Sequence, residues 1–327
     1  MAWQEIDLNF IDLTRLEKNL QGSLAYLVDQ IQHEIDHIRF IRSRSDTVER
    51  PIGIEPRPNT EHWLSRGSSR LLIAVGESFT WSENLYGMAG QTLDGPVVHS
   101  VIQNLFTIQG RLASQFGSDL RSVTVPGNAN VLMISALQRV LEEISSLDQW
   151  EEIIVLQQFT ERSRCQKTVG HPSIPWYNQW TNPNDIFSDQ WFIDQEQFLL
   201  QQLDQVIADH VHLPIKCWAW RNFDPWIVCD LDQFKQINFV KTSMNEFKYV
   251  LHGLPIQPHP VCIGSEYFQQ LISHDIPSEH LDWLSLQVDR CLVQQDWIKH
   301  NRFQDHPRAN MTLLWARYLT HCGVHFG

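Results

Sequence analysis

Short apolar runs alternate with longer segments of helical periodicity through most of this 327-residue chain. Runs of strand length occur at residues 71–75, 122–125, 152–159 and 214–220. Apolar positions at spacings of three and four predict helices at residues 97–116, 131–147, 196–212, 278–298 and 313–319. Because strands that alternate with helices favour a parallel sheet covered on both sides, the pattern predicts a three-layer α/β/α fold with residues 71–75 as a central parallel strand.

The same pattern divides the chain into two parts. Residues 1–65 precede the first expected strand, and we interpret them as a helical N-terminal extension. One helix face, over residues 24–42, carries Leu24, Val28, Ile31, Ile35 and Ile38, and a polar connection with prolines follows over residues 43–58. Residues 66–327 form the main domain, in which residues 170–191 are expected to be an ordered, aromatic loop and residues 224–277 an insertion.

The strand at residues 71–75 stops abruptly at Gly76-Glu77-Ser78. Its continuous apolar character is typical of a parallel strand buried on both faces. Gly76 permits a sharp turn, so Ser78 is expected just past the carboxyl end of the strand, where ligands bind in open α/β sheets. Either Ser78 is a nucleophile, or Ser78 or Thr80 is simply the N-cap of a following helix.

Two later stretches favour the nucleophile. The second strand ends in Pro126-Gly127-Asn128-Ala129-Asn130, and His306-Pro307 stands just before the last predicted helix. Pro307 is tolerated in the first turn of a helix, so His306 is expected at the helix entrance. With Gly76-Glu77-Ser78-Phe79-Thr80-Trp81, these blocks resemble, in this order and over roughly residues 70–320, those of the SGNH (GDSL-like) hydrolase family.

The resemblance implies a flavodoxin-like α/β/α domain and a serine hydrolase of the esterase or deacylase type, with no cofactor and no metal. Ser78 would be the nucleophile and His306 the base that removes its proton, because a serine hydroxyl is a poor nucleophile without such a base. Asp305 would orient the histidine ring. The expected substrate is an ester of a small molecule or a carbohydrate.

The oxyanion hole implied by the resemblance consists of the backbone N–H groups of Ser78 and Gly127 and one side-chain donor. In the family that donor is the asparagine of a Gly-x-Asn-Asp block after the third strand, but here the strand is followed by Thr160-Glu161-Arg162-Ser163-Arg164. We therefore expect Asn130 or Thr160 to replace it. The alternative for Asn130, and for Asn128, is the N-cap of the helix that follows.

Other departures from the family pattern keep a second function open. Glu77 stands where the family has Asp, and Phe303 occupies the usual position of the acid, three residues before the histidine. Asp305 directly precedes His306, and neighbouring side chains usually diverge, so a backbone carbonyl could orient the ring instead. The alternative to an esterase is a catalytically degenerate protein of the SGNH fold that serves in binding or assembly.

Charge and cysteine usage restrict the partners and the compartment. The net charge of −13 and the absence of a Lys/Arg cluster argue against a nucleic-acid or anionic-membrane surface, and favour neutral substrates over polyanions. The six cysteines form no Cys-x-x-Cys pair, which favours free thiols in a reducing compartment. Without a signal-peptide pattern or a run of about 20 apolar residues, we expect a cytoplasmic protein. The sequence does not indicate an oligomeric state.

One motif points to different chemistry. His33-Glu34-Ile35-Asp36-His37 matches the His-Glu-x-x-His pattern of zinc enzymes, in which both histidines bind the metal and the glutamate acts as a base. The two histidines lie off the apolar stripe of their predicted helix, and no downstream motif identifies a third ligand. We therefore expect an ordinary polar helix face with no zinc.

Overall fold

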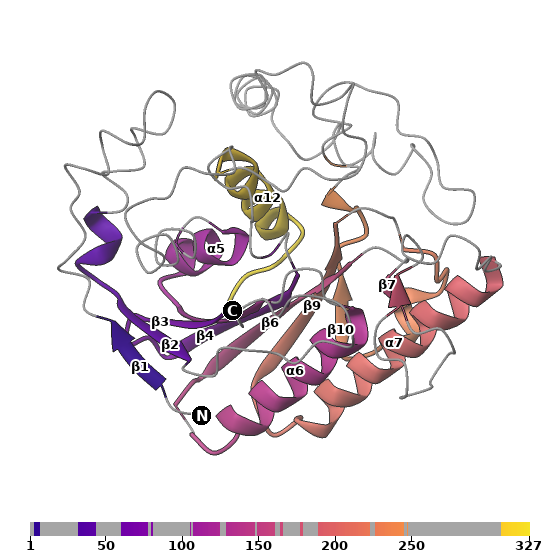
Figure 1. Cartoon of the computed structure of the whole chain (residues 1–327), viewed down its shortest axis with the longest axis horizontal. Helices are drawn as coiled ribbons and strands as arrows, with labels where there is room; N and C mark the ends of the chain where they lie inside the picture. The colour runs from indigo at the N-terminus through magenta and orange to yellow at the C-terminus, as the bar shows by residue number, and fades with distance from the viewer. Residues whose placement is uncertain are drawn as a thin grey trace.

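The computed structural model describes residues 3–6, 32–43, 60–77, 80, 105, 107–124, 129–147, 149–160, 164–165, 177–178, 189–222, 226–244, 247 and 309–327. These residues form a sheet in the strand order β1-β2-β3-β5-β4-β6-β9-β10 (Figure 1). Its strands are β1 (Trp3–Ile6), β2 (Arg39–Ser43), β3 (Thr60–Ser65), β4 (Arg70–Gly76), β5 (Asp119–Thr124), β6 (Glu152–Phe159), β9 (Ile215–Arg221) and β10 (Ile237–Phe239). A separate antiparallel pair joins β7 (Arg164–Cys165) to β8 (Tyr177–Asn178).

The five neighbouring strands β5, β4, β6, β9 and β10 are all parallel. Taken in chain order, β4 is the first of them, and the spatial order β5-β4-β6-β9-β10 is the flavodoxin-like order 2-1-3-4-5. Strand β4 lies between β5 and β6, with Leu71 paired to Asp119 on one side and to Ile153 on the other. The predicted α/β/α fold and its central strand are therefore confirmed.

Helices cover both faces of the parallel sheet (Figure 1). Helices α6 (Asn130–Ile144) and α7 (Asp189–Asp209) lie on one face, and α5 (Ile108–Phe116) and α12 (Ala309–His321) pack together on the other. Among the helices that the structure describes, none combines the length and the apolar character that crossing a membrane requires.

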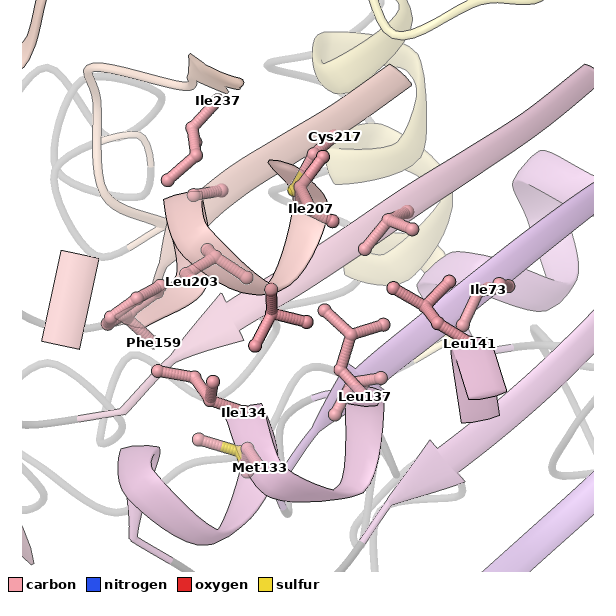
Figure 2. Close-up of a cluster of buried hydrophobic side chains, with 14 of the residues drawn as sticks. Ile73, Met133, Ile134, Leu137, Leu141, Phe159, Leu203, Ile207, Cys217 and Ile237 are labelled. Atoms are coloured by element: carbon pink, nitrogen blue, oxygen red, sulfur yellow. The ribbon is translucent and has the colours of Figure 1, made fainter. Parts of the chain in front are cut away.

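The larger core cluster lies between the sheet and helices α6 and α7. Alternate residues of the strands supply one side of it, as Ile73 of β4 and Phe159 of β6 do, and Leu137 and Leu203 supply the helix side (Figure 2). Two other residues of β4, Leu72 and Ala74, alternate with those of the cluster and are also fully buried, under the opposite helix layer. A strand that is apolar at every position is thus explained by burial on both faces.

Helix α12 runs against the direction of the parallel strands. The rings of Trp315, in the middle of the helix, and Trp220, near the carboxyl end of β9, have centroids 5.7 Å apart. Near the end of α12, Thr320 accepts a hydrogen bond from Gln115 in the last turn of α5, which leads directly into the start of β5. The first turn of α12, from Ala309, therefore lies toward the carboxyl edge of the sheet.

The N-terminal extension differs from the prediction. Residues 32–35 are helical, but Arg39–Ser43 is strand β2 and not the end of a helix, and β3 lies where no strand was expected. Strands β1, β2 and β3 continue the main sheet in antiparallel fashion beyond β5. The apolar positions over 24–38 fit a helix up to Ile38, and the change to a strand directly after it carries no proline or glycine signal.

Three further boundaries are corrected. Residues 237–239, predicted to belong to an insertion, form β10 and pair with β9, so this part of 224–277 belongs to the sheet. Helix α7 begins at Asp189, inside the predicted aromatic loop. Helix α6 has Ala129 at its N-cap position and Asn130 as its first residue, so Asn130 is not the cap. The predicted helix at 278–298 lies outside the described residues.

Candidate active site

The predicted motifs follow strands that are neighbours in the sheet. Strands β5, β4 and β6 lie side by side, and their carboxyl ends, at Thr124, Gly76 and Phe159, share one edge of the sheet. Ser78 and Gly127 come two and three residues after Gly76 and Thr124 respectively, but they lie outside the described residues, as do Asp305 and His306. The structure therefore describes the strands that precede Ser78 and Gly127 and the helix that follows His306.

Residues on both sides of Ser78 are held from β6. Gln158 Oε1 accepts hydrogen bonds from the backbone N–H of Glu77, at 3.2 Å, and of Thr80, at 3.0 Å, and also from the Thr80 hydroxyl. Gly76 lies against the same groups, since a Cβ atom there would be 2.6 Å from Thr80 Cβ. The chain therefore turns back over Gly76, and the glycine is required for space.

Glu77 is fully buried and lies within hydrogen-bond distance of two neutral amide donors. Its Oε1 accepts from Gln158 Nε2 and from Asn222 Nδ2, both at 2.9 Å. A carboxylate removed from water is costly unless such donors replace the solvent. Asn222 directly follows β9, so the side chain of Glu77 links the ends of β4, β6 and β9.

A second layer of hydrogen bonds supports the turn from α5. Gln109 donates through Nε2 to the Thr80 carbonyl at 3.0 Å and to Ser122 Oγ on β5 at 3.2 Å. Thr107 caps α5 by accepting from the Gly110 N–H, which fixes the start of the helix beside the turn. The backbone at Thr80 is thus held from both β6 and α5.

Asn130 and Thr160 are brought together, as the two candidate side-chain donors of the oxyanion hole. Asn130 Oδ1 accepts from the Thr160 backbone N–H at 2.8 Å, and both residues are buried. Because a backbone N–H can only donate, the amide oxygen must face Thr160 and Nδ2 must point elsewhere. The orientation of the Asn130 amide is therefore fixed by its contact with Thr160.

Thr160 is itself held in place by charged residues. Its carbonyl accepts from Arg221 Nη2 at 3.3 Å, and Arg221 forms a buried ion pair with Glu196 of α7. Glu196 also accepts from the backbone N–H groups of Ile227 and Val228. The Thr160 hydroxyl is buried and has no hydrogen-bond partner within the part of the chain that the structure describes.

The His-Glu-x-x-His segment has a different environment from that of a metal centre. The rings of His33 and His37 lie 4.9 Å apart, both residues are exposed, and Glu34 pairs with Arg66 and Ser114. Within the described residues, no group of three His, Cys, Asp or Glu side chains could hold a metal ion. Glu34 is thus engaged in contacts to Arg66, between β3 and β4, and to Ser114 of α5.

No family model matches the chain, and no curated protein matches it. Family membership is therefore not established by sequence.

Solved structures share a distant likeness with the chain. One is described as a carbohydrate esterase whose active site displays divergent catalytic and non-catalytic binding functions (12% identity, TM-score 0.36, 79% of this chain and 66% of that one). Another is a family two carbohydrate esterase from Clostridium thermocellum in complex with cellohexaose (12%, 0.34, 84% and 65%). A third is an acetyl xylan esterase, Est2A, from the rumen bacterium Butyrivibrio proteoclasticus (12%, 0.32, 57% and 58%). The chain spans less than two thirds of the length of each, and likeness at this level establishes neither a family nor an activity.

Sequence reasoning missed the amide side chains that hold the site. Gln158 and Asn222 carry no family motif, and Gln109 lies inside a predicted helix. The only available signal was the pair Gln157-Gln158 at the end of an otherwise apolar strand, where a buried polar side chain must find a partner.

Proposed function

We propose that this protein is a serine hydrolase of the SGNH type that cleaves an ester, with Ser78 as nucleophile and His306 as general base. The observation that carries the proposal is that β4 and β5, after which Ser78 and Gly127 come, end at one edge of the sheet, and that α12, which follows His306, begins toward that edge. The carboxyl edge is where ligands bind in sheets of this type.

The spacing along the chain supports this arrangement. Ser78 lies between Glu77 and Thr80, whose backbone N–H groups both contact Gln158. His306 precedes Ala309 by three residues, which can span about 11 Å at most. The first turn of α12 lies toward the carboxyl edge, which favours a base at position 306 on the same edge as the turn that follows β4.

In the proposed reaction His306 takes the proton of the Ser78 hydroxyl as Oγ attacks the ester carbonyl. The tetrahedral intermediate collapses when the C–O bond to the alcohol breaks and His306 returns the proton to the leaving oxygen. Water, activated by the same histidine, then hydrolyses the acyl-serine ester. Asp305, or a backbone carbonyl, would orient the imidazole.

The negative oxygen of the intermediate needs donors that are already in place. We assign this role to the backbone N–H groups of Ser78 and Gly127, and to a side-chain donor from Asn130 or Thr160. The contact between Asn130 Oδ1 and the Thr160 N–H favours Asn130, because it frees Nδ2 to donate. The loss of one such donor typically costs about 10²–10³ in rate.

The substrate class follows from charge. A chain with a net charge of −13 repels polyanions, so we propose a neutral ester of a small molecule or a carbohydrate. Chain length and leaving group are left to the assay, which should compare acetyl and longer acyl esters.

Hydrolysis of p-nitrophenyl acetate by purified wild-type protein, Ser78→Ala and His306→Ala tests the proposal. We expect kcat/KM to fall at least about 10³-fold in each variant, since members of one catalytic unit fail together. Asp305→Ala should cost less. A fluorophosphonate probe should label the wild type and not Ser78→Ala.

Ser69→Ala is the matched control, because Ser69 precedes the opposite end of β4 and is exposed. It should leave the activity unchanged. Equal activity in wild type and Ser78→Ala, with the fold intact by circular dichroism, would refute the hydrolase and favour the alternative of a degenerate protein that binds a ligand or an assembly partner.

A further inference from the structure

Gln158 contacts both described residues that flank Ser78. It is fully buried, accepts the Glu77 and Thr80 backbone N–H groups and the Thr80 hydroxyl at Oε1, and donates from Nε2 to the Glu77 carboxylate. One side chain on β6 thus closes the turn that follows β4. Few other side chains could do this, because the position needs an acceptor and a donor at fixed places.

Gln157, the preceding residue, provides a built-in comparison. It pairs in register with Val75 and Ala219, both in the cluster under α6 and α7, so its side chain lies on that face. Gln158 lies on the opposite face, next to Gly76 and in register with Trp220. Both glutamines are fully buried, and the described contacts of the Gln157 side chain do not reach residues 77 or 80.

We propose that Gln158 is a positioning residue for the Ser78 turn, an inference that rests on the proposed function. Its amide fixes the backbone on both sides of the nucleophile and so sets the place of the Ser78 hydroxyl relative to the base and to the oxyanion donors. A displacement of about 1 Å at such a position can cost about 10²-fold in rate. The effect should be on kcat, because Gln158 does not contact the substrate in this scheme.

The exchange Gln158→Glu turns this role into a dependence on pH. When the introduced carboxyl group is protonated, it keeps one acceptor and one donor, and so can replace the amide. When it is ionised, it has no donor and stands against the Glu77 carboxylate, and two like charges in a buried site raise the pKa of the pair. The turn should therefore be intact at low pH and disturbed as the pH rises through that pKa.

The charged groups around position 158 favour a simple titration of the carboxyl group introduced by Gln158→Glu. In the described part of the chain, Glu77 is the charged side chain that contacts Gln158, while Thr80, Gln109 and Asn222 supply neutral groups. Arg221 belongs to the other face, where it pairs with Glu196. His62 lies on the same face as Gln158, but on β3, with β5 and β4 between.

The test measures kcat and KM for p-nitrophenyl acetate between pH 5.5 and 9 in wild type, Gln158→Glu, Gln157→Glu and Ser78→Ala. We expect the ratio of kcat in Gln158→Glu to kcat in wild type to fall about tenfold or more across this range, with KM within about threefold of wild type. For Gln157→Glu the same ratio should not change with pH. Gln158→Met, which has no amide, should lose about 10²-fold in kcat at every pH.

The outcomes separate the two proposals. If Ser78→Ala is inactive while Gln158→Glu and Gln158→Met match the wild type at all pH values, the positioning role is wrong and the hydrolase stands. Equal, pH-independent losses in Gln158→Glu and Gln157→Glu would assign Gln158 only to stability, which also overturns the inference. If wild type and Ser78→Ala do not differ, the proposed function fails and the inference fails with it.

Discussion

Adding a single methyl group at Gly76 tests the packing of the turn most directly. Gly76 is the last residue of β4, and it is not among the described glycines with positive φ, so backbone conformation does not require glycine there. Space does, because the Cβ of Gly76→Ala would lie 2.5 Å from Gln158 Oε1 and 2.6 Å from Thr80 Cβ. Both distances are well inside van der Waals contact.

The loss in the free energy of unfolding can be worked out from these contacts. The Thr80 hydroxyl lies closest to the added methyl group and must move away. For Thr80 Cβ to reach an ordinary separation of 3.4 Å it must move about 0.8 Å, and Gln158 must yield as well, which weakens its hydrogen bonds to residues 77 and 80. Overpacking of this kind costs about 1–3 kcal/mol, and a weakened buried hydrogen bond about 1 kcal/mol more. We expect the free energy of unfolding to fall by about 3 kcal/mol, which corresponds to a fall in Tm of roughly 4–5 °C for a chain of 327 residues.

The assay combines thermal unfolding with ester hydrolysis. If the proposed function holds, Gly76→Ala should also lose about 10²-fold in kcat, because the turn that carries Ser78 shifts by nearly 1 Å. Gly117→Ala is the control: Gly117 has φ 59°, and a Cβ there meets nothing within 4 Å. It should cost about 1–2 kcal/mol through its left-handed backbone and leave kcat unchanged. A Gly76→Ala protein with wild-type Tm would refute the described packing.

Two further outcomes follow from buried groups away from the site. Glu61→Gln should lower the free energy of unfolding, measured in urea, by about 3 kcal/mol. The reason is that buried Glu61 of β3 binds Arg121 of β5 at 2.7 Å and Arg139 of α6 at 3.0 Å. A loss below about 1 kcal/mol would contradict this. Burial raises the pKa of the Cys322 thiol to about 11. Iodoacetamide at pH 8 should therefore alkylate Cys322 up to about 10²-fold more slowly in native than in urea-unfolded protein, as followed by peptide mass spectrometry. Equal rates would show that the thiol is accessible and its pKa unperturbed.

Strands β4 and β6 of the parallel half could be predicted because they are apolar over most of their length. Residues 71–75 and 152–159 fall within one residue of β4 and β6, since both strands are buried on both faces and carry an apolar run, which in β6 extends from Ile153 to Leu156. Strand β10 has only three residues, Ile237–Phe239, which is too short for any periodicity to show. It was therefore assigned to an insertion.

The antiparallel half of the sheet could not be predicted, for a different reason. Residues 39–43 read Arg-Phe-Ile-Arg-Ser, and directly before them the apolar positions of residues 24–38 fit a helix. The sequence has no glycine or proline between the two, so the change of structure has no local signal. The strand forms because its backbone pairs with β3, and through β3 with β5, and such pairing is a property of the tertiary structure.

Glu77 shows the same limit at the site itself. Compared with the aspartate of the SGNH pattern, the glutamate adds a methylene beside the proposed nucleophile, which counts against activity when only the sequence is known. In the structure this carboxylate reaches Gln158 and Asn222, which lie 81 and 145 residues further along the chain and follow or end different strands. A buried carboxylate with two amide donors is a satisfied group that ties the turn to β6 and β9. The exchange at position 77 is thus accommodated by a matching set of partners, and it does not by itself favour a degenerate protein over a hydrolase.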